Sequence, residues 1–382
     1  MAERKLRMGM VGGGEGAFIG AVHRMAAELD GEIELVCGAF SSDPERSRRS
    51  GEALYKLAPE RSYENYQALF AGEAARPADD RMDFVTIVTP NHLHFDVARA
   101  ALEAGFHVVC DKPLTHRLED AHVLAEVAIA SGRLFCLTHN YTGHPMVREA
   151  RALVTSGALG AVRRVNCEYL QGWLADAEER SGNKQAEWRT DPDRAGAAGC
   201  FGDIGSHGQN LLEYVTGEIV TEVAAELTSW VDGRALDDDG NVLLRLSGGG
   251  RGVLSASQIA VGEENNLTLR VYGERGGLSW SQQEPNTLVL RWPDRSVEIR
   301  RTGGPGTGAA SVAATRLPAG HPEGYLEAFA VLYRNFAAAM RAQAAGDRVS
   351  GDYPGIEDGV RGMRFIEAVV KSSAAGGSWI SV

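Results

Sequence analysis

Lysine is scarce in this chain. Of its 39 basic residues only Lys5, Lys56, Lys112, Lys184 and Lys371 are lysines, and all the others are arginines. An excess of positive charge is also missing, because the formal net charge is -12 at pH 7. Proteins that bind nucleic acid or anionic membranes need fields of Lys and Arg to meet the phosphates. We therefore predict neither nucleic acid nor a membrane among the partners of this protein.

Cysteines are few, and long apolar runs are absent. The five cysteines, at positions 37, 110, 136, 167 and 200, are widely spaced and include no C-x-x-C pair. This pattern favours buried reduced thiols and predicts no bound metal. No stretch reaches the ~18 consecutive apolar residues of a membrane span, and the N-terminus has no signal-peptide pattern. We expect a soluble, cytoplasmic protein.

The length of the chain favours two domains. Its 382 residues exceed one ordinary core, and 44% hydrophobic with 24% charged residues is typical of a globular protein. The first part, to about residue 140, alternates short apolar runs with amphipathic stretches, which predicts βαβ units on a parallel sheet. After about residue 220, alternating strand patterns separated by Gly-rich or Pro-Asp turns predict an antiparallel meander.

The expected elements follow from this punctuation. Strands are predicted at Leu6–Val11, Ile33–Phe40, Phe84–Thr89, Phe106–Cys110 and Leu134–Thr138. Helices are predicted near residues 17–29, 43–57, 92–104, 117–131, 323–345 and 355–373. The glycine-rich segment 302–311 is predicted to be a flexible loop.

A glycine motif follows the first predicted strand. Gly12, Gly14 and Ala17 match G-x-G-x-x-[GA] at the start of a predicted helix. Bare backbone there lets a pyrophosphate approach the helix N-terminus, so the motif predicts a dinucleotide site. The alternative is a glycine-rich turn that serves only close packing of strand and helix. Phe18 to Gly20 lengthen the motif.

The end of the second predicted strand bears on the cofactor. An acidic residue at this tip would bind the adenosine ribose of NAD, whereas a small polar residue with a nearby Arg accepts the 2'-phosphate of NADP. Ser41 and Ser42 occupy the tip, Asp43 follows, and Arg46 lies one turn later. Asp43 could instead cap its helix ahead of Pro44. The residues slightly favour NAD and leave NADP open.

Two further strand ends carry polar residues. Pro90 and Asn91 follow the third strand and can form a wall beside the nicotinamide. His92 and His94 are two apart and point to different faces of a helix, so they cannot chelate one metal, and we interpret them as packing and capping groups. Lys112 follows the fourth strand, where its ammonium would project into the same crevice.

The segment "GCFGDIGSHGQNLLEYVTG" (199–217) brings a carboxylate close to an imidazole. Asp203 and His207 are four apart and share a face if a helix begins here. A His beside a carboxylate can take a hydroxyl proton near neutral pH, while the carboxylate orients the ring or contacts substrate. The alternative is a solvated Asp at a helix start and a packing His.

Together, "TPNHLH", "CDKPL", "HNY" and "GDIGSH" make the chain resemble the Gfo/Idh/MocA family of sugar oxidoreductases over nearly its whole length. The resemblance implies an α/β protein: a Rossmann dinucleotide-binding domain with a doubly wound parallel sheet over 1–140, then a substrate-binding and oligomerisation α/β domain over 141–382. The second domain is expected to hold a large open, mainly antiparallel sheet, through which such proteins form homo-oligomers, here a dimer or tetramer.

The resemblance also implies roles for residues. Lys112 is expected to orient the substrate, His207 to be the acid/base, and Asp203 to be its companion near the sugar hydroxyls. The candidate cofactor-binding residues are Gly12, Gly14, Glu15, Ala17, Phe18, Ile19, Ser41, Ser42, Arg46, Thr89, Pro90, Asn91, His94, Asp111, Lys112 and Asn140. The candidate substrate-binding residues are Lys112, Tyr141, Trp188, Arg189, Asp203 and His207.

The sequence thus predicts an NAD(P)-dependent oxidoreductase that transfers a hydride between nicotinamide and a secondary alcohol of a sugar, cyclitol or related polyol. None of the lysines has a Tyr four residues before it, so the Y-x-x-x-K site of short-chain dehydrogenases is absent. Two alternatives remain. One is an NAD-dependent glycosidase or other sugar-modifying enzyme that oxidises a sugar carbon transiently, and the other is a catalytically idle NAD-sensing protein.

Overall fold

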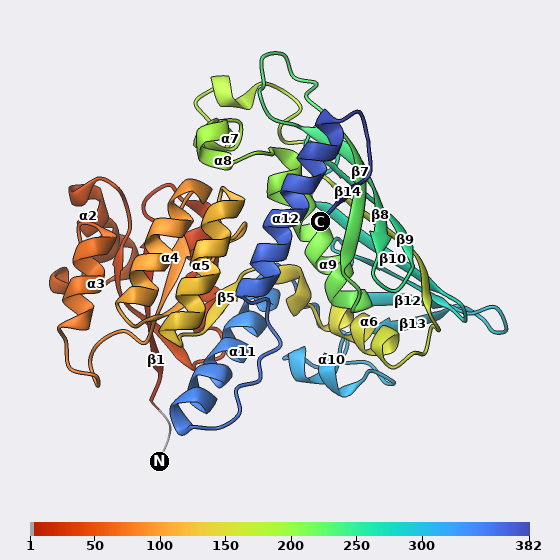
Figure 1. The fold of residues 1–382 in the computed structure, drawn as a ribbon. Coiled ribbons are helices and arrows are strands. Elements are labelled where there is room, and N and C mark those ends of the chain that lie inside the picture. Colours follow the sequence, from red (N-terminus) through yellow and green to blue (C-terminus); the bar gives the residue numbers. More distant parts are fainter. Residues whose placement is uncertain (1–3) are drawn as a thin grey trace. The chain divides into compact units, whose positions relative to one another are not determined.

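The computed structural model describes residues 4–382, which form two compact units. The first unit contains the residues up to Thr138 together with Phe329–Val360. The second unit contains His139–Ala328 and Arg361–Val382. Two C-terminal helices, α11 (Tyr325–Ala345) and α12 (Ile356–Ala374), therefore contribute to both units (Figure 1).

The first unit is built on a five-stranded parallel sheet. Its strands are ordered β2-β1-β3-β4-β5, and every neighbouring pair is parallel. The carboxyl ends of all five strands consequently lie at one edge of the sheet. The predicted parallel sheet is confirmed, with strands β1 (Leu6–Gly12), β2 (Ile33–Ala39), β3 (Phe84–Val88), β4 (His107–Cys110) and β5 (Phe135–Leu137).

Helices connect these strands. Four of them, α1, α2, α4 and α5, match the predicted amphipathic stretches, and α4 and α5 run side by side (Figure 1). Sequence reasoning missed α3, which Asn65 caps by accepting a hydrogen bond from the Ala68 N–H at 2.8 Å. The helical segments are α1 (Phe18–Glu28), α2 (Pro44–Tyr55), η1 (Pro59–Arg61), α3 (Tyr66–Ala74), η2 (Asn91–Leu93), α4 (His94–Glu103) and α5 (Leu118–Ser131).

The C-terminal helix α11 completes the core of the first unit. The rings of Phe336 and Phe84 pack edge to face with centroids 5.8 Å apart. The Tyr333 hydroxyl lies 3.1 Å from the Thr86 hydroxyl and 2.7 Å from Nδ1 of His23. Burial lowers the pKa of His23 to about 4, so this ring is neutral near pH 7. The hydrogen bonds satisfy polar groups that the core would otherwise leave unpaired.

The second unit is built on a nine-stranded sheet ordered β13-β12-β11-β10-β6-β9-β8-β7-β14. All neighbouring pairs are antiparallel except β6 and β9. The predicted large, mainly antiparallel sheet is confirmed. Its strands are β6 (Val162–Leu170), β7 (Val220–Thr228), β8 (Asp239–Leu246), β9 (Arg251–Ser257), β10 (Asn266–Gly273), β11 (Gly277–Ser281), β12 (Thr287–Arg291), β13 (Glu298–Arg301) and β14 (Ile380–Ser381).

Helices cover one face of this sheet. A Cβ on Gly208 of α9 would lie 2.5 Å from Leu254 and 3.3 Å from Cys167, so glycine lets this helix lie close against β9 and β6. The predicted loop 302–311 is wrong at its end, because α10 begins at Ala309. The helical segments are η3 (Asn140–Gly143), α6 (Pro145–Thr155), η4 (Glu178–Arg180), α7 (Lys184–Arg189), α8 (Pro192–Ala195), η5 (Phe201–Gly205), α9 (Ser206–Thr216) and α10 (Ala309–Ala314).

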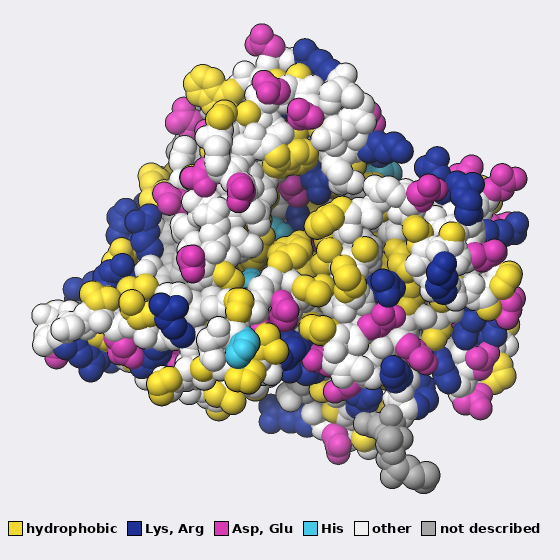
Figure 2. All heavy atoms as spheres, turned by 180° about the vertical axis from the view of Figure 1, so that it is seen from behind, with side chains coloured by type: hydrophobic (Ala, Val, Ile, Leu, Met, Phe, Trp, Pro, Cys, Tyr) yellow, Lys and Arg dark blue, Asp and Glu magenta, His cyan; other side chains and the backbone are white. Residues whose placement is uncertain are grey.

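The cysteine prediction is confirmed: all five thiols are free and buried, and burial raises the pKa of each. Within residues 4–382 no cluster of three or more His, Cys, Asp or Glu could hold a metal ion, and no described helix is long and apolar enough to span a bilayer. Figure 2 shows basic and acidic side chains interspersed over the face that it draws.

Candidate functional site

The end of β1 and the loop that follows it each need a glycine. A Cβ on Gly14 would lie 2.4 Å from the Phe40 carbonyl oxygen, and Gly12 has a φ of +89° and would place a Cβ 2.7 Å from the Val88 oxygen. At the start of α1, Ala17 is the N-cap, and no described side chain caps the helix. The exposed backbone and uncapped helix N-terminus fit the phosphates of a dinucleotide.

The other candidates of this loop lie around it. The backbone N–H of Glu15 donates to the Ser50 hydroxyl at 3.2 Å, and its carboxylate pairs with Arg49 at 3.3 Å on the surface. Phe18, the first residue of α1, is 67% exposed, whereas Ile19 is half-buried. A large exposed aromatic side chain at this edge is available to cover a ligand.

At the end of β2, Asp43 is occupied as a helix cap. Its Oδ1 accepts from the Arg46 N–H at 2.7 Å, with Pro44 in the first turn of α2. The Ser41 hydroxyl accepts from the Asp43 N–H at 3.1 Å, and Ser42 is exposed. The capping alternative for Asp43 is thus observed, and two serines remain at the strand tip.

The loops after β3 and β4 are joined by a buried histidine. Thr89, Pro90 and Asn91 follow β3, and His94 is the first residue of α4. Nδ1 of His94 lies 2.7 Å from the Pro113 carbonyl oxygen, and its Nε2 lies 2.9 Å from that of Thr89. Burial lowers the pKa of His94, while the hydrogen bond to Pro113 acts in the opposite direction.

Asp111 fixes the backbone next to the lysine. Its Oδ1 accepts from the Lys112 N–H at 2.9 Å and from the Thr138 hydroxyl, beyond β5, at 3.0 Å. The Lys112–Pro113 peptide bond is cis, and the Lys112 side chain is half-buried. The candidates from 12 to 112 therefore gather at the carboxyl edge of one sheet, where open α/β sheets bind ligands.

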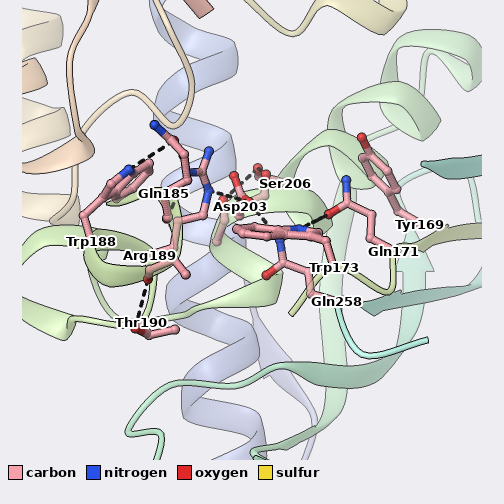
Figure 3. A network of polar contacts seen from close by, with 12 residues as sticks. Tyr169, Gln171, Trp173, Gln185, Trp188, Arg189, Thr190, Asp203, Ser206 and Gln258 are labelled. Carbon is pink, nitrogen blue, oxygen red and sulfur yellow. Dashed lines mark hydrogen bonds and ion pairs between the residues drawn. The ribbon is translucent and has the colours of Figure 1, made fainter. Parts of the chain in front are cut away.

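In the second unit, Asp203 lies in a π-helical turn, η5, that runs directly into α9. The expected helix start is present, with a wider turn than an α-helix has. Oδ2 of Asp203 accepts from Arg189 Nε at 3.0 Å and from Gln258 Nε2 at 2.9 Å (Figure 3). Donors from two separate segments, α7 and the end of β9, thus converge on one carboxylate. Such turns recur at functional sites.

His207 lies on the next turn and is buried among aromatic rings. Its ring centroid lies 4.9 Å from that of Tyr141 and 5.3 Å from that of His139, both in edge-to-face geometry. The Tyr141 hydroxyl accepts from Asn265 Nδ2 at 3.2 Å and contacts the Tyr169 hydroxyl. Burial raises the pKa of Tyr141 and also that of Tyr169, so both hydroxyls keep their protons.

Arg189 is held from several sides. Its Cζ lies 4.2 Å from the centre of the Trp188 ring and 5.8 Å from that of Trp173. Its Nη1 donates to the side-chain oxygen of Gln185 at 2.7 Å. Asp203 balances the guanidinium charge. Trp188 and Arg189 thus lie beside Asp203, as drawn in Figure 3.

Sequence reasoning missed several members of this group. Gln171 and Gln258 directly follow β6 and β9, and the sequence predictions include neither of them. The only local signal is that position, since Asp203 and Asn265, to which these side chains donate, lie far away in sequence. Asn140 lies in η3, which belongs to the second unit and begins three residues after β5 ends. The missed residues are Tyr169, Gln171, Trp173, Gln258 and Asn265.

A parallel sheet with a glycine loop at an open helix N-terminus defines a Rossmann protein that binds a dinucleotide. Comparison with family models makes the assignment specific. The model of the oxidoreductase family with an NAD-binding Rossmann fold matches residues 6–139, and that of the GFO/IDH/MocA C-terminal domain matches residues 147–279. This chain belongs to the Gfo/Idh/MocA oxidoreductase family and carries its NAD-binding domain.

Individual relatives span the whole chain. The uncharacterized oxidoreductase YfiI of Bacillus subtilis is 33% identical over 99% of this chain and 97% of its own length. An inositol dehydrogenase homologue from Azotobacter vinelandii is similar in two crystal structures, one complexed with NAD+ (TM-score 0.95, 37% identity) and one with NADH and myo-inositol (0.91, 36%). Each covers 99% of this chain and 98% of that one. Levoglucosan dehydrogenase of Pseudarthrobacter phenanthrenivorans is 27% identical over 99% and 98%.

Replacing Gly14 with Ala should weaken cofactor binding. The new methyl group would meet the Phe40 oxygen and displace the backbone that the phosphates approach. We expect the dissociation constant for NADH, from fluorescence titration, to rise at least about tenfold. Gly324→Ala is the control, because neither Gly14 nor Gly324 has a positive φ, and a Cβ on Gly324 would meet only Oε2 of Glu327, at an ordinary contact distance of 3.9 Å. Equal affinities in both variants would contradict this account of the loop.

Proposed function

We propose that this protein is an NAD(P)-dependent dehydrogenase acting on a secondary alcohol of a sugar, cyclitol or related polyol. One observation carries the proposal: a carboxylate held by two donors, Asp203, and a buried imidazole, His207, stand on successive turns at the start of α9. Neutral tyrosine hydroxyls and amides surround them. Such groups suit a ligand rich in hydroxyl groups.

The proton chemistry is assigned to His207. Oxidation of a carbinol removes a hydride from carbon and a proton from oxygen as the C=O bond forms. A nicotinamide, when bound, supplies the acceptor for the hydride. His207 is the base that takes the hydroxyl proton, because imidazole titrates near neutral pH. The Asp203 carboxylate stabilises the positive charge that this transfer places on the ring.

Lys112 is assigned to the same hydroxyl oxygen. As the proton leaves, negative charge develops on that oxygen, and an ammonium donor stabilises it. A lysine offers a compact charge with rotatable donors, unlike the planar fork of arginine. This preference gives a reason for a lysine at this edge in a chain where nearly every other cation is Arg. Asp111 keeps the lysine backbone in position.

The relatives support the substrate class. One structure of the inositol dehydrogenase homologue holds NADH and myo-inositol, and one structure of levoglucosan dehydrogenase holds NADH and levoglucosan. Both ligands are neutral and rich in hydroxyl groups. We therefore favour NAD over NADP, and a neutral cyclitol or sugar over a charged substrate.

A substrate panel tests the function. Purified protein is mixed with cyclitols, free sugars and anhydrosugars, each with NAD+ and NADP+ in parallel, and the absorbance of the reduced nicotinamide is followed. We expect net NADH release with at least one neutral polyol. His207→Gln is the matched control, with turnover at least roughly a hundredfold lower because the base is lost. A sugar glycoside that is hydrolysed without net NADH release would favour the glycosidase alternative, and a fully silent panel would contradict both activities.

We further propose a homo-oligomer, a dimer or tetramer, formed through the sheet of the second unit. The face opposite α9 carries Leu243 and Ile299, which are 51% and 56% exposed. Light scattering on the purified protein should give a multiple of the chain mass of 40.9 kDa, and Leu243→Glu should lower it. Leu317→Glu, in a loop, is the control. A monomeric wild-type protein would contradict the proposal.

A cytoplasmic location, inferred from the reduced thiols, is tested by cell fractionation.

A further inference from the structure

Gln258 contacts the candidate site from the sheet. It directly follows β9 and is only 2% exposed. Its Nε2 donates to Oδ2 of Asp203 at 2.9 Å and to Oε1 of Gln171 at 3.3 Å. A buried amide needs partners for both of its N–H groups, and a core could supply backbone carbonyls for that purpose. Here both partners are side chains, and one is the candidate catalytic carboxylate.

The direction of every hydrogen bond behind Gln258 is fixed. A carboxylate only accepts, so the amide nitrogen of Gln258 faces Asp203. An indole N–H only donates, so Oε1 of Gln171 faces Trp173 at 3.0 Å, and this oxygen also accepts from Gln258. Nε2 of Gln171 then donates to Asn265 Oδ1 at 2.6 Å. The donors and acceptors in this series of hydrogen bonds are therefore determined, and Gln258 is the donor to Asp203.

The two donors to Asp203 differ in how they are anchored. The Arg189 side chain is 23% exposed, belongs to the short helix α7 and also bonds Gln185 (Figure 3). Gln258 is buried, and its amide donates to Gln171. Gln171 is itself hydrogen-bonded to Trp173 and Asn265. The orientation of the carboxylate consequently depends on the sheet as well as on the helical segment.

We propose that Gln258 is a positioning residue for the reaction: it holds the Asp203 carboxylate in the orientation that His207 requires when it takes up the substrate proton. This inference rests on the proposed function. Gln258 touches no reacting atom and acts through Asp203. Without its N–H donor, the carboxylate loses one of the two donors that hold Oδ2, and its orientation is less closely fixed. The stabilisation of the protonated imidazole is then reduced.

Two isosteric variants test the role. Gln258→Met removes the donor and keeps the volume, and we expect kcat to fall about tenfold, with NADH affinity unchanged, as expected for one hydrogen bond to a charged group. Gln258→Glu places a second carboxyl group against Asp203. Two carboxylates at this distance share one proton with a raised pKa, and the new carboxyl group can donate to Asp203 only while the pair holds that proton. The kcat of Gln258→Glu should therefore fall as pH rises through an added ionisation that the wild type lacks, at least about one pH unit above the pKa of a lone carboxyl group.

The charged and titratable groups around Asp203 decide how this pH profile is interpreted. Arg189 faces the carboxylate from α7, His207 lies on the following turn, and Cys200 and Tyr141 interact with it electrostatically. None of these groups changes in either variant. Gln343→Glu is the control for the added charge, because Gln343 lies in the first unit, where its Nε2 donates to the Gly132 carbonyl oxygen at 2.9 Å. It should keep the wild-type profile.

The outcomes separate this inference from the proposed function. If the wild-type protein fails to reduce NAD+ or NADP+ with every polyol tested, the proposed function itself is contradicted. Activity in the wild type together with an unshifted profile in Gln258→Glu contradicts the positioning role alone. Equal losses of thermal stability in both variants with wild-type kcat also overturn it, because Gln258 would then serve only the fold. If Gln258→Met does not fold, the profile of Gln258→Glu still decides.

Discussion

The second unit depends on one electrostatic constraint, which is that an ionised carboxylate must be kept in place beside a buried imidazole. A carboxylate that is partly removed from water is stable only when charged or strongly polar donors replace the solvent. Asp203 has two such donors on one oxygen, the guanidinium of Arg189 and the amide of Gln258. The donors arrive from α7 and from the end of β9. Satisfying this one carboxylate therefore links a helical segment, the start of α9 and the sheet.

The first unit follows a different constraint, which is close approach of backbone at a strand edge. Gly12 and Gly14 leave no room for a side chain, and α1 begins there without a side-chain cap among the described residues. Polar side chains then tie neighbouring loops together. His94 joins the segments after β3 and β4, and Asp111 joins those after β4 and β5. These two connections hold the backbone on either side of Lys112, so they fix the position of its Cα.

Much of the fold could be predicted from local sequence patterns. Short apolar runs placed the strands of the first unit to within one residue at each end, because buried parallel strands need continuous apolar sequence. The helix α3 was not predicted, because its apolar residues do not gather on one helix face. Its start depends on the Asn65 cap. The parallel pairing of β6 with β9 also could not be predicted, because it joins strands far apart in the chain.

The candidate site divides in the same way. Asp203 and His207 could be found because their spacing of four is a local signal. Gln258 and Gln171 could not, since Asp203 lies 55 residues from Gln258 and the two glutamines are 87 residues apart, and a lone glutamine after a strand has many uses. The polarity of their hydrogen bonds became visible only from coordinates. The sequence thus predicted Asp203 and His207, but it did not predict the glutamine side chains that hydrogen-bond to Asp203 and to each other.

We propose that Lys112 and His207 act on one hydroxyl group of the substrate. A double-mutant cycle measures this most directly, with kcat of Lys112→Ala, His207→Ala and the double variant compared on the substrate that the wild type oxidises. Residues that act as a unit show strongly non-additive losses. We expect the double variant to be about as slow as the slower single variant. Losses that multiply would show that the two residues act independently and would contradict this proposal.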